Sequence, residues 1–338
     1  MVKIAVIGAG SWGTALSQVL AGNGHDVALW ARKPEVVSGI NEQHRNPRYL
    51  TDAQLSTRLR ATLSYAEALD GAGAVVVVTP SHLVRSVARE LAKPEYAFGV
   101  DVPILICSKG VEEQTGALPI EAMAQEAGGA ERVAVLSGPN HAEEVIKGQP
   151  SATVIASSSG QTAVFFRDLF ATDTFRTYTS DDPTGVELCA AFKNVIAIAV
   201  GISYGLGFGD NTASLLITRG LAEMSRMVVA AGGQALTCMG LAGAGDMVVT
   251  CMSRHSRNRR FGEQYVARGR TVDDFAAETH MVVEGALACK TLEVLARRYG
   301  VELPITDTVR DIVWNGADVK TAVKLLSDRP LTTEFYGL

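Results

Sequence analysis

Residues 3–16 read KIAVIGAGSWGTAL, a short apolar strand followed by a glycine-rich turn and helix-forming sequence. Gly8 permits a tight turn, Gly10 lets the backbone approach a pyrophosphate, and Gly13 lets the helix pack closely on the strand. The amides at the helix N-terminus then face the phosphates. A second apolar strand, 26–31, follows at the spacing of a βαβ unit. The stretch predicts a turn that binds a nicotinamide or flavin dinucleotide, with a ligand-free glycine turn as the alternative.

Length and composition describe an ordinary soluble protein. The chain has 338 residues, enough for two domains, with 47% apolar and 20% charged residues. A net charge of -5 argues against a general nucleic-acid binder but leaves room for a local basic pocket that holds a phosphorylated small molecule. The start of the chain lacks the pattern of a signal peptide, and the apolar run 195–202 is too short to span a bilayer. These features predict a cytoplasmic protein without stable membrane insertion.

The cysteines and histidines show no metal-binding pattern. The six histidines include no HExxH arrangement, so no metal is predicted. The five cysteines have no CxxC spacing and are expected to be mostly buried thiols, as in a reducing cytosol: Cys107, Cys189, Cys238, Cys251 and Cys289.

Strand and helix patterns alternate up to about residue 180. Further strands are expected at 74–79, 103–108, 133–138, 151–156 and 174–179, with helices such as 81–92 between them. Alternation of this kind predicts a mostly parallel, doubly wound sheet with helices on both faces.

The pattern changes at residues 181–183, Asp-Asp-Pro. One aspartate can cap a helix whose first turn contains Pro183, and 185–200 reads as one long apolar helix. Further helices are expected at 212–231, 257–268, 272–278, 284–299, 306–315 and 319–327. We therefore predict an α/β dinucleotide-binding domain at 1–182 and an all-α substrate-binding domain at 183–338.

Lys193 lies in the apolar helix GVELCAAFKNVIAIAV, residues 185–200. A lysine in such surroundings must find a partner or lose its proton, because desolvation disfavours the charged form. Lys193 is therefore a candidate acid/base. The alternative is a snorkelling or structurally paired lysine.

A glycine-rich loop at 240–246, GLAGAGD, presents the carboxylate of Asp246, and the cationic run SRHSRNRR follows at 253–260. Cations beside a helix start fit a phosphate or other oxyanion site. A solvated basic face is the alternative.

Polar turns follow two consecutive strands, at 108–110 with Lys109 and at 137–140. Ligands of doubly wound sheets collect at the carboxyl ends of the strands, so these turns predict a cleft. The second strand ends in Arg32 and Lys33 instead of an acidic residue, which favours the 2′-phosphate of NADP over NAD. The competing interpretation is that both are exposed loop charges.

Taken together, these motifs resemble the bacterial type of NAD(P)-dependent glycerol-3-phosphate dehydrogenase, from residue 1 to about 330. The resemblance rests on GAGSWGTALS near the start, CSKGVE at 107–112, SGPNHAEEV at 137–145, AAFKNVIAIAVGI at 190–202, GLAGAGDM at 240–247, SRNRRFG at 256–262 and VVEG at 282–285. It implies a Rossmann-type domain followed by a helical domain, with dihydroxyacetone phosphate and sn-glycerol 3-phosphate interconverted at the cleft between them.

The resemblance also implies roles for individual residues. Lys193 would be the catalytic acid/base. The substrate site would contain Lys109, Gly138, Asn140, Lys193, Asp246, Ser256, Arg257 and Asn258. The cofactor site would contain Gly8, Gly10, Ser11, Trp12, Gly13, Arg32, Lys33, Tyr49, Lys109, Ala142, Arg257, Val282 and Glu284. The family commonly has serine and phenylalanine where this chain has Asn140 and His141, although asparagine can still donate and accept hydrogen bonds.

The function predicted from this resemblance is reduction of dihydroxyacetone phosphate to sn-glycerol 3-phosphate for phospholipid synthesis, with NADPH favoured over NADH. Lys193 would protonate the ketone oxygen, Asp246 and Lys109 would set its orientation, and Arg257 would hold the phosphate. The alternatives are a related dehydrogenase of 3-hydroxy acids and a non-catalytic dinucleotide sensor. Neither nucleic acid nor membrane is an expected partner, and a homodimer is an open alternative to the monomer.

Overall fold

The computed structural model describes the chain except for residues 97–98, 100, 280, 331–332, 335–336 and 338. The chain divides into two compact units. The sheet unit comprises residues 1–109 and 119–183, and the helical unit comprises 110–118 and 184–338. The short segment 110–118 thus belongs to the helical unit although it lies within the N-terminal part of the sequence.

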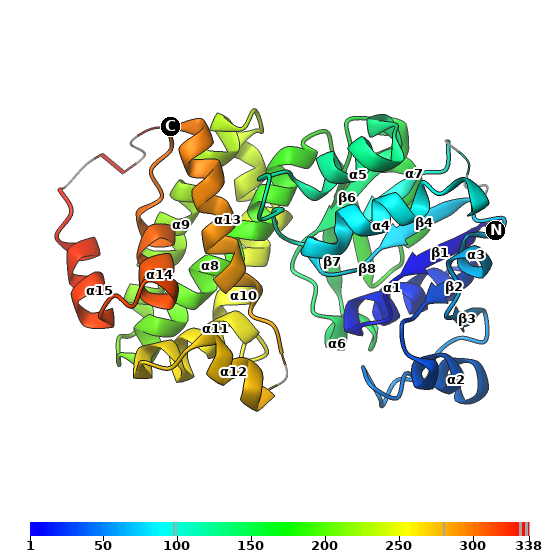
Figure 1. Ribbon diagram of the computed structural model, residues 1–338, viewed down its shortest axis with the longest axis horizontal. Helices are drawn as coiled ribbons and strands as arrows, with labels where there is room; N and C mark the ends of the chain where they lie inside the picture. The colour runs from blue at the N-terminus through cyan, green and yellow to red at the C-terminus, as the bar shows by residue number, and fades with distance from the viewer. Residues whose placement is uncertain (97–98, 100, 280, 331–332, 335–336, 338) are drawn as a thin grey trace. The chain divides into compact units, whose positions relative to one another are not determined.

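The sheet unit contains an eight-stranded sheet with the order β3-β2-β1-β4-β5-β6-β7-β8 (Figure 1). Every neighbouring pair is parallel except β6 and β7, which are antiparallel. The strands are β1 Lys3–Ile7, β2 Asp26–Trp30, β3 Leu59–Thr62, β4 Ala74–Val77, β5 Ile104–Ile106, β6 Val133–Ser137, β7 Ser151–Ala156 and β8 Phe175–Ser180. The central strand β4, AVVV, is buried along its whole length, as expected for a parallel strand covered on both faces.

Helices cover this sheet and complete its core. They are α1 Ser11–Gly22, α2 Pro34–Gln43, α3 Tyr65–Leu69, α4 Val84–Leu91, α5 Pro119–Ala127, α6 Ala142–Val145 and α7 Gly160–Phe170. Leu16 and Leu20 of α1 and Phe166 and Phe170 of α7 are fully buried in one cluster with the strand residues. The predicted doubly wound α/β architecture is confirmed.

The sheet unit differs from the prediction at one omitted strand and one expected helix. The strand β3 was not predicted, because its residues, LRAT, include an arginine and a threonine and lack the continuous apolar run that β4 and β5 show. The helix expected at 81–92 is divided into a 3-10 turn, Ser81–Leu83, and α4.

The helical unit is built around α8, Pro183–Gly205, which is apolar on all sides. The other helices are α9 Asp210–Ala230, α10 Asp246–Met252, α11 Arg257–Gln264, α12 Val272–Thr279, α13 Glu284–Tyr299, α14 Pro304–Trp314 and α15 Val319–Ser327. Short turns at Ala235–Met239, Leu241–Gly245 and Val266–Arg268 join some of them. The predicted all-α second part of the chain is confirmed.

Helix α8 is longer than the apolar run that the sequence indicated. Its 23 residues and a mean hydropathy of 1.7 would suffice by length and composition to cross a membrane. The 18-residue stretch of the helix that has this mean hydropathy is entirely buried inside the protein, which is the pattern of a core helix. The helix therefore provides the apolar centre of the helical unit.

Candidate functional site

The glycine turn after β1 has the shape that a dinucleotide requires. Gly8 has φ of 121°, and a Cβ atom there would lie 2.7 Å from the carbonyl oxygen of Val78. A Cβ atom on Gly13 would lie 1.8 Å from the carbonyl oxygen of Gly8, so α1 can pack only with glycine at this position. Gly10 differs, because apart from Gly10 and its two chain neighbours no described atom lies within 4 Å of its Cβ position. The space in front of the α1 N-terminus is therefore open, as close approach of a pyrophosphate needs.

The end of β2 presents two cations. Arg32 is exposed, and Lys33 is half-buried at the N-cap position of α2. Tyr49, in the loop after α2, is 41% exposed. The three predicted cofactor residues therefore remain accessible to a ligand.

The polar turns after β5 and β6 contact each other. The ammonium group of Lys109 donates a hydrogen bond to the carbonyl oxygen of Gly138 at 3.5 Å. Asn140 donates its amide to the carbonyl oxygen of Ala152 at 2.8 Å, whereas its Oδ1 atom is buried without a hydrogen-bond partner in the described structure. The hydroxyl of Thr79, just after β4, is buried without a partner in the same way. A polar ligand at this edge of the sheet would satisfy such groups.

The helical unit buries an ion pair. The Nζ atom of Lys193 on α8 lies 2.5 Å from Oδ1 of Asp246 and donates to the Thr250 hydroxyl at 3.2 Å. The Lys193 and Asp246 side chains are only 8% and 2% exposed. The pairing explains how a charged lysine is accommodated among apolar neighbours. It agrees with both the acid/base role and the structural role considered for Lys193.

The glycine-rich segment before Asp246 is helical, so the predicted loop was wrong. Residues Leu241–Gly245 form a π-helical turn that continues into α10. A Cβ atom on Gly243 would lie 2.0 Å from the carbonyl oxygen of Cys238, so glycine allows this turn to pack on the preceding segment. Asp246 therefore begins a helix, and Thr250 follows one turn later on the same face. The predicted site omitted Thr250, which the i, i+4 spacing from Asp246 could have indicated.

The polar groups beside Lys193 join three helices. Asn258 of α11 donates its amide to Oδ1 of Asn194 at 2.9 Å and accepts a hydrogen bond from the Gly285 amide of α13 at 2.9 Å. A Cβ atom on Gly285 would lie 2.4 Å from the carbonyl oxygen of Asn194, so the two backbones touch. Asn194, which the predicted site omitted, is therefore part of the framework that holds α11 and α13 against α8.

Arg257 is exposed to solvent, whereas its neighbour Ser256 is buried. Ser256 caps α11, and its buried hydroxyl accepts from the Arg259 amide at 3.2 Å. Arg257 itself is exposed, and its guanidinium makes no hydrogen bond or ion pair with any residue the structure describes. At the start of α13, Glu284 is half-buried and Val282 is 56% exposed. Arg257 is thus available to an anion.

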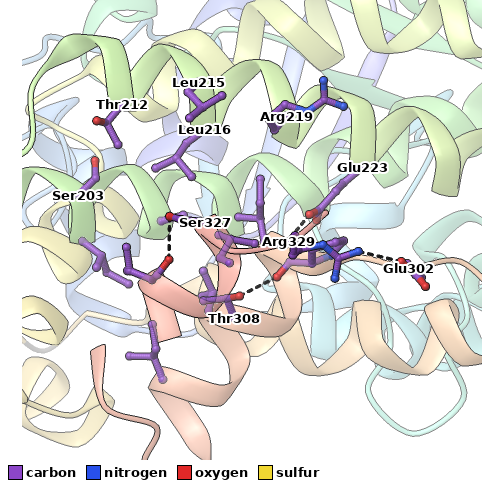
Figure 2. Close-up of a pocket in the computed structure, with 18 of the residues that line it drawn as sticks. Ser203, Thr212, Leu215, Leu216, Arg219, Glu223, Glu302, Thr308, Ser327 and Arg329 are labelled. Atoms are coloured by element: carbon purple, nitrogen blue, oxygen red, sulfur yellow. Dashed lines mark hydrogen bonds and ion pairs between the residues drawn. The ribbon is translucent and has the colours of Figure 1, made fainter. Parts of the chain in front are cut away.

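The helical unit also contains a cavity of about 690 Å³ that the sequence did not predict (Figure 2). Apolar side chains of α8, α9, α14 and α15 form most of its wall, and an ion pair of 3.0 Å between Arg329 and Glu302 closes one side. The buried Glu223 accepts hydrogen bonds from the Thr306 amide and hydroxyl at 3.2 and 3.1 Å. Burial raises the pKa of Glu223 to about 7. Lys193, the candidate acid/base, does not line this cavity.

The cysteines are the next group for which the sequence made a prediction. All five cysteines are buried and free, which confirms that prediction. Within the described ranges, no group of three or more His, Cys, Asp or Glu side chains is placed to hold a metal ion.

The chain has a dinucleotide turn on a doubly wound sheet and a second unit that buries a lysine–aspartate pair. This combination is the one expected of an NAD(P)-dependent oxidoreductase. Family models described as the N-terminus and the C-terminus of NAD-dependent glycerol-3-phosphate dehydrogenase match residues 3–163 and 182–324. The chain belongs to this family.

Relatives cover almost the whole chain. A protein of Nitratidesulfovibrio vulgaris (strain DP4) named glycerol-3-phosphate dehydrogenase [NAD(P)+] is 47% identical over 98% of this chain and 100% of its own length. A protein of the same name from Enterococcus faecalis (strain ATCC 700802 / V583) is 44% identical over 98% of each chain. The crystal structure of glycerol-3-phosphate dehydrogenase from Coxiella burnetii has a TM-score of 0.90 at 36% identity and covers 97% of this chain and 99% of that one. The predicted family, fold class and NAD(P) dependence are confirmed, whereas the roles of individual site residues stay predictions.

Proposed function

We propose that the chain reduces dihydroxyacetone phosphate to sn-glycerol 3-phosphate and that Lys193 supplies the proton. The observation that carries the proposal is the buried ion pair of 2.5 Å between Lys193 and Asp246, in a chain that closely matches proteins named glycerol-3-phosphate dehydrogenase. The family assignment supports this reaction over oxidation of a 3-hydroxy acid and over dinucleotide sensing without catalysis.

The reaction needs a hydride and a proton, and the bound NADPH or NADH supplies the hydride. Lys193 donates a proton to the ketone oxygen while negative charge develops on that oxygen. Asp246 favours the ammonium form of Lys193 and fixes its position, with Thr250 as a second contact. Proton transfer from a positioned group typically contributes on the order of 100 to 10,000-fold in rate.

Four cationic side chains are proposed to bind the substrate phosphate and the cofactor. The exposed guanidinium of Arg257 can bind phosphate oxygens with paired donors. Lys109, beside Gly138, is the candidate for contact with both substrate and cofactor. Arg32 and Lys33 are proposed to bind the 2′-phosphate and so to favour NADPH.

The physiological setting follows from the reaction. We propose a cytoplasmic enzyme that provides sn-glycerol 3-phosphate for phospholipid synthesis, without nucleic acid as a partner. A homodimer is the assembly to test, by light scattering during size-exclusion chromatography.

A cofactor absorbance assay tests the reaction. The purified protein should oxidise NADPH with dihydroxyacetone phosphate, and it should not reduce NADP⁺ with 3-hydroxy acids. Turnover of 3-hydroxy acids alone would assign the other dehydrogenase reaction, and binding of NADPH without turnover of either substrate would favour a sensor.

A further inference from the structure

The loop between α2 and β3 is attached to the glycine turn by one buried side chain, Asn46, which is 1% exposed. Its amide nitrogen donates to the carbonyl oxygen of Ala9 at 3.2 Å and to the Thr14 hydroxyl at 2.8 Å. Its Oδ1 atom accepts from the amides of Arg48 at 3.0 Å and Tyr49 at 3.2 Å. Both N–H donors and both lone pairs of the side-chain amide are therefore used.

These four bonds join two parts of the predicted cofactor site. Ala9 lies in the glycine turn, and Thr14 is fully buried in α1, directly after that turn. On the other side of Asn46 is the backbone that presents the exposed Tyr49. The Asn46 side chain thus sets the distance between two expected cofactor contacts. One is the glycine turn, which is expected to face the pyrophosphate, and the other is Tyr49.

The backbone of this loop includes two residues in the left-handed region. His44 and Leu50, on either side of Asn46, have φ values of 52° and 56°. Residues other than glycine rarely adopt this left-handed region, and they do so where surrounding contacts enforce it. His44 is the left-handed C-cap of α2, where the closing hydrogen bonds of the helix stabilise this conformation. Leu50 directly follows Tyr49, whose amide is held by Asn46.

We propose that Asn46 is a positioning residue for the cofactor, holding the glycine turn and the Tyr49 loop in the arrangement that binds the dinucleotide. The inference rests on the proposed function, because it takes the glycine turn and Tyr49 as cofactor contacts. A preorganised site binds more tightly, since the loop does not have to be ordered during binding.

The chain offers a matched control in Asn41. Its amide donates to the carbonyl oxygen of Ala61 at 2.8 Å, and its Oδ1 atom accepts from the Ala61 amide at 2.8 Å. Asn41 therefore joins α2 to β3 in the same unit and makes a similar structural contribution without a hydrogen bond to the glycine turn.

The test compares Asn46→Ala and Asn46→Asp with Asn41→Ala and Asn41→Asp. Asn46→Asp retains the acceptors for the loop amides but cannot donate to the carbonyl oxygen of Ala9, so it breaks the link to the glycine turn, whereas the Thr14 hydroxyl can donate to the new carboxylate. We expect the Kd of NADPH, titrated by its fluorescence without substrate, to rise about tenfold in both Asn46 variants. The KM for NADPH should rise in parallel, while kcat at saturating NADPH and the KM for dihydroxyacetone phosphate stay within about twofold. The Asn41 variants should lower the melting temperature but leave the Kd within about twofold.

A further variant, Thr14→Val, removes only one hydrogen-bond partner of Asn46 and keeps the test informative if the Asn46 variants do not fold. It should raise the Kd of NADPH about threefold. Unchanged NADPH binding in the folded Asn46 and Thr14 variants would overturn the inference, as would an equal loss in the Asn41 variants. Failure of the proposed function would look different, because the unaltered protein would then bind NADPH without reducing dihydroxyacetone phosphate.

Discussion

Replacing Lys193 by methionine tests the buried ion pair most directly. The change keeps an unbranched side chain of similar length but leaves the Asp246 carboxylate, only 2% exposed, without its cation at 2.5 Å. Removing one partner of a buried pair costs about 3–5 kcal/mol, because the remaining charge is uncompensated, whereas replacing both partners by neutral groups is often close to neutral. We therefore expect Lys193→Met to be much less stable than the double variant with Asp246→Asn.

Turnover should follow a different order from stability. If Lys193 donates the proton, its loss lowers kcat by about 100-fold or more, a change of roughly 3 kcal/mol in the barrier. The double variant should recover stability without recovering turnover, since no proton donor has been restored. NADPH affinity should change little in either variant, because the role of Lys193 lies in the transition state.

Two measurements separate these effects: urea unfolding for stability, and cofactor absorbance with dihydroxyacetone phosphate for turnover. A kcat within tenfold of the unaltered enzyme in folded Lys193→Met would remove Lys193 from the mechanism. A double variant that loses the sum of the two single losses in stability would show that the pair is not energetically coupled.

Three further predictions concern other charged groups. Replacing Arg32 and Lys33 by neutral residues should weaken the binding of NADPH much more than that of NADH, by roughly 1.5–3 kcal/mol per lost phosphate contact. Equal losses of affinity for both cofactors would contradict a role in recognising the 2′-phosphate. Arg257→Lys should raise the KM for dihydroxyacetone phosphate about tenfold or more, because an ammonium lacks the paired donors of a guanidinium. Turnover of dihydroxyacetone, which has no phosphate, should stay nearly unchanged. Equal effects on both substrates would place the phosphate elsewhere, with Lys109 the next candidate. Burial raises the pKa of Glu223 from 4.5 to about 7, so the folded state keeps a proton that the unfolded state loses, and stability should fall by about 3 kcal/mol as the pH rises from about 4.5 to 7. Urea unfolding at several pH values should show that Glu223→Gln removes this slope, and an unchanged slope would assign it to other groups.

Much of the fold could be predicted because its signals are local. The expected helices at 284–299 and 319–327 and the strand at 151–156 have the observed bounds. The α/β order followed from the alternation of strand and helix patterns, which each segment shows by itself. Segments with weak or mixed local preference were missed or misjudged, as the strand β3 and the π-helical turn before Asp246 show.

The sequence by itself determined the dinucleotide turn, the class of fold, the family and the candidate Lys193, because glycine spacing and apolar periodicity are properties of neighbouring residues. Only the tertiary structure decided which polar groups meet. Lys193 and Asp246 are 53 residues apart, Asn46 and Ala9 are 37 apart, and Glu223 and Thr306 are 83 apart. A buried charge or amide needs a hydrogen-bonding partner. Which residue becomes that partner depends on which segments the packed core brings within about 3 Å. That distance is set by the whole arrangement of sheet and helices.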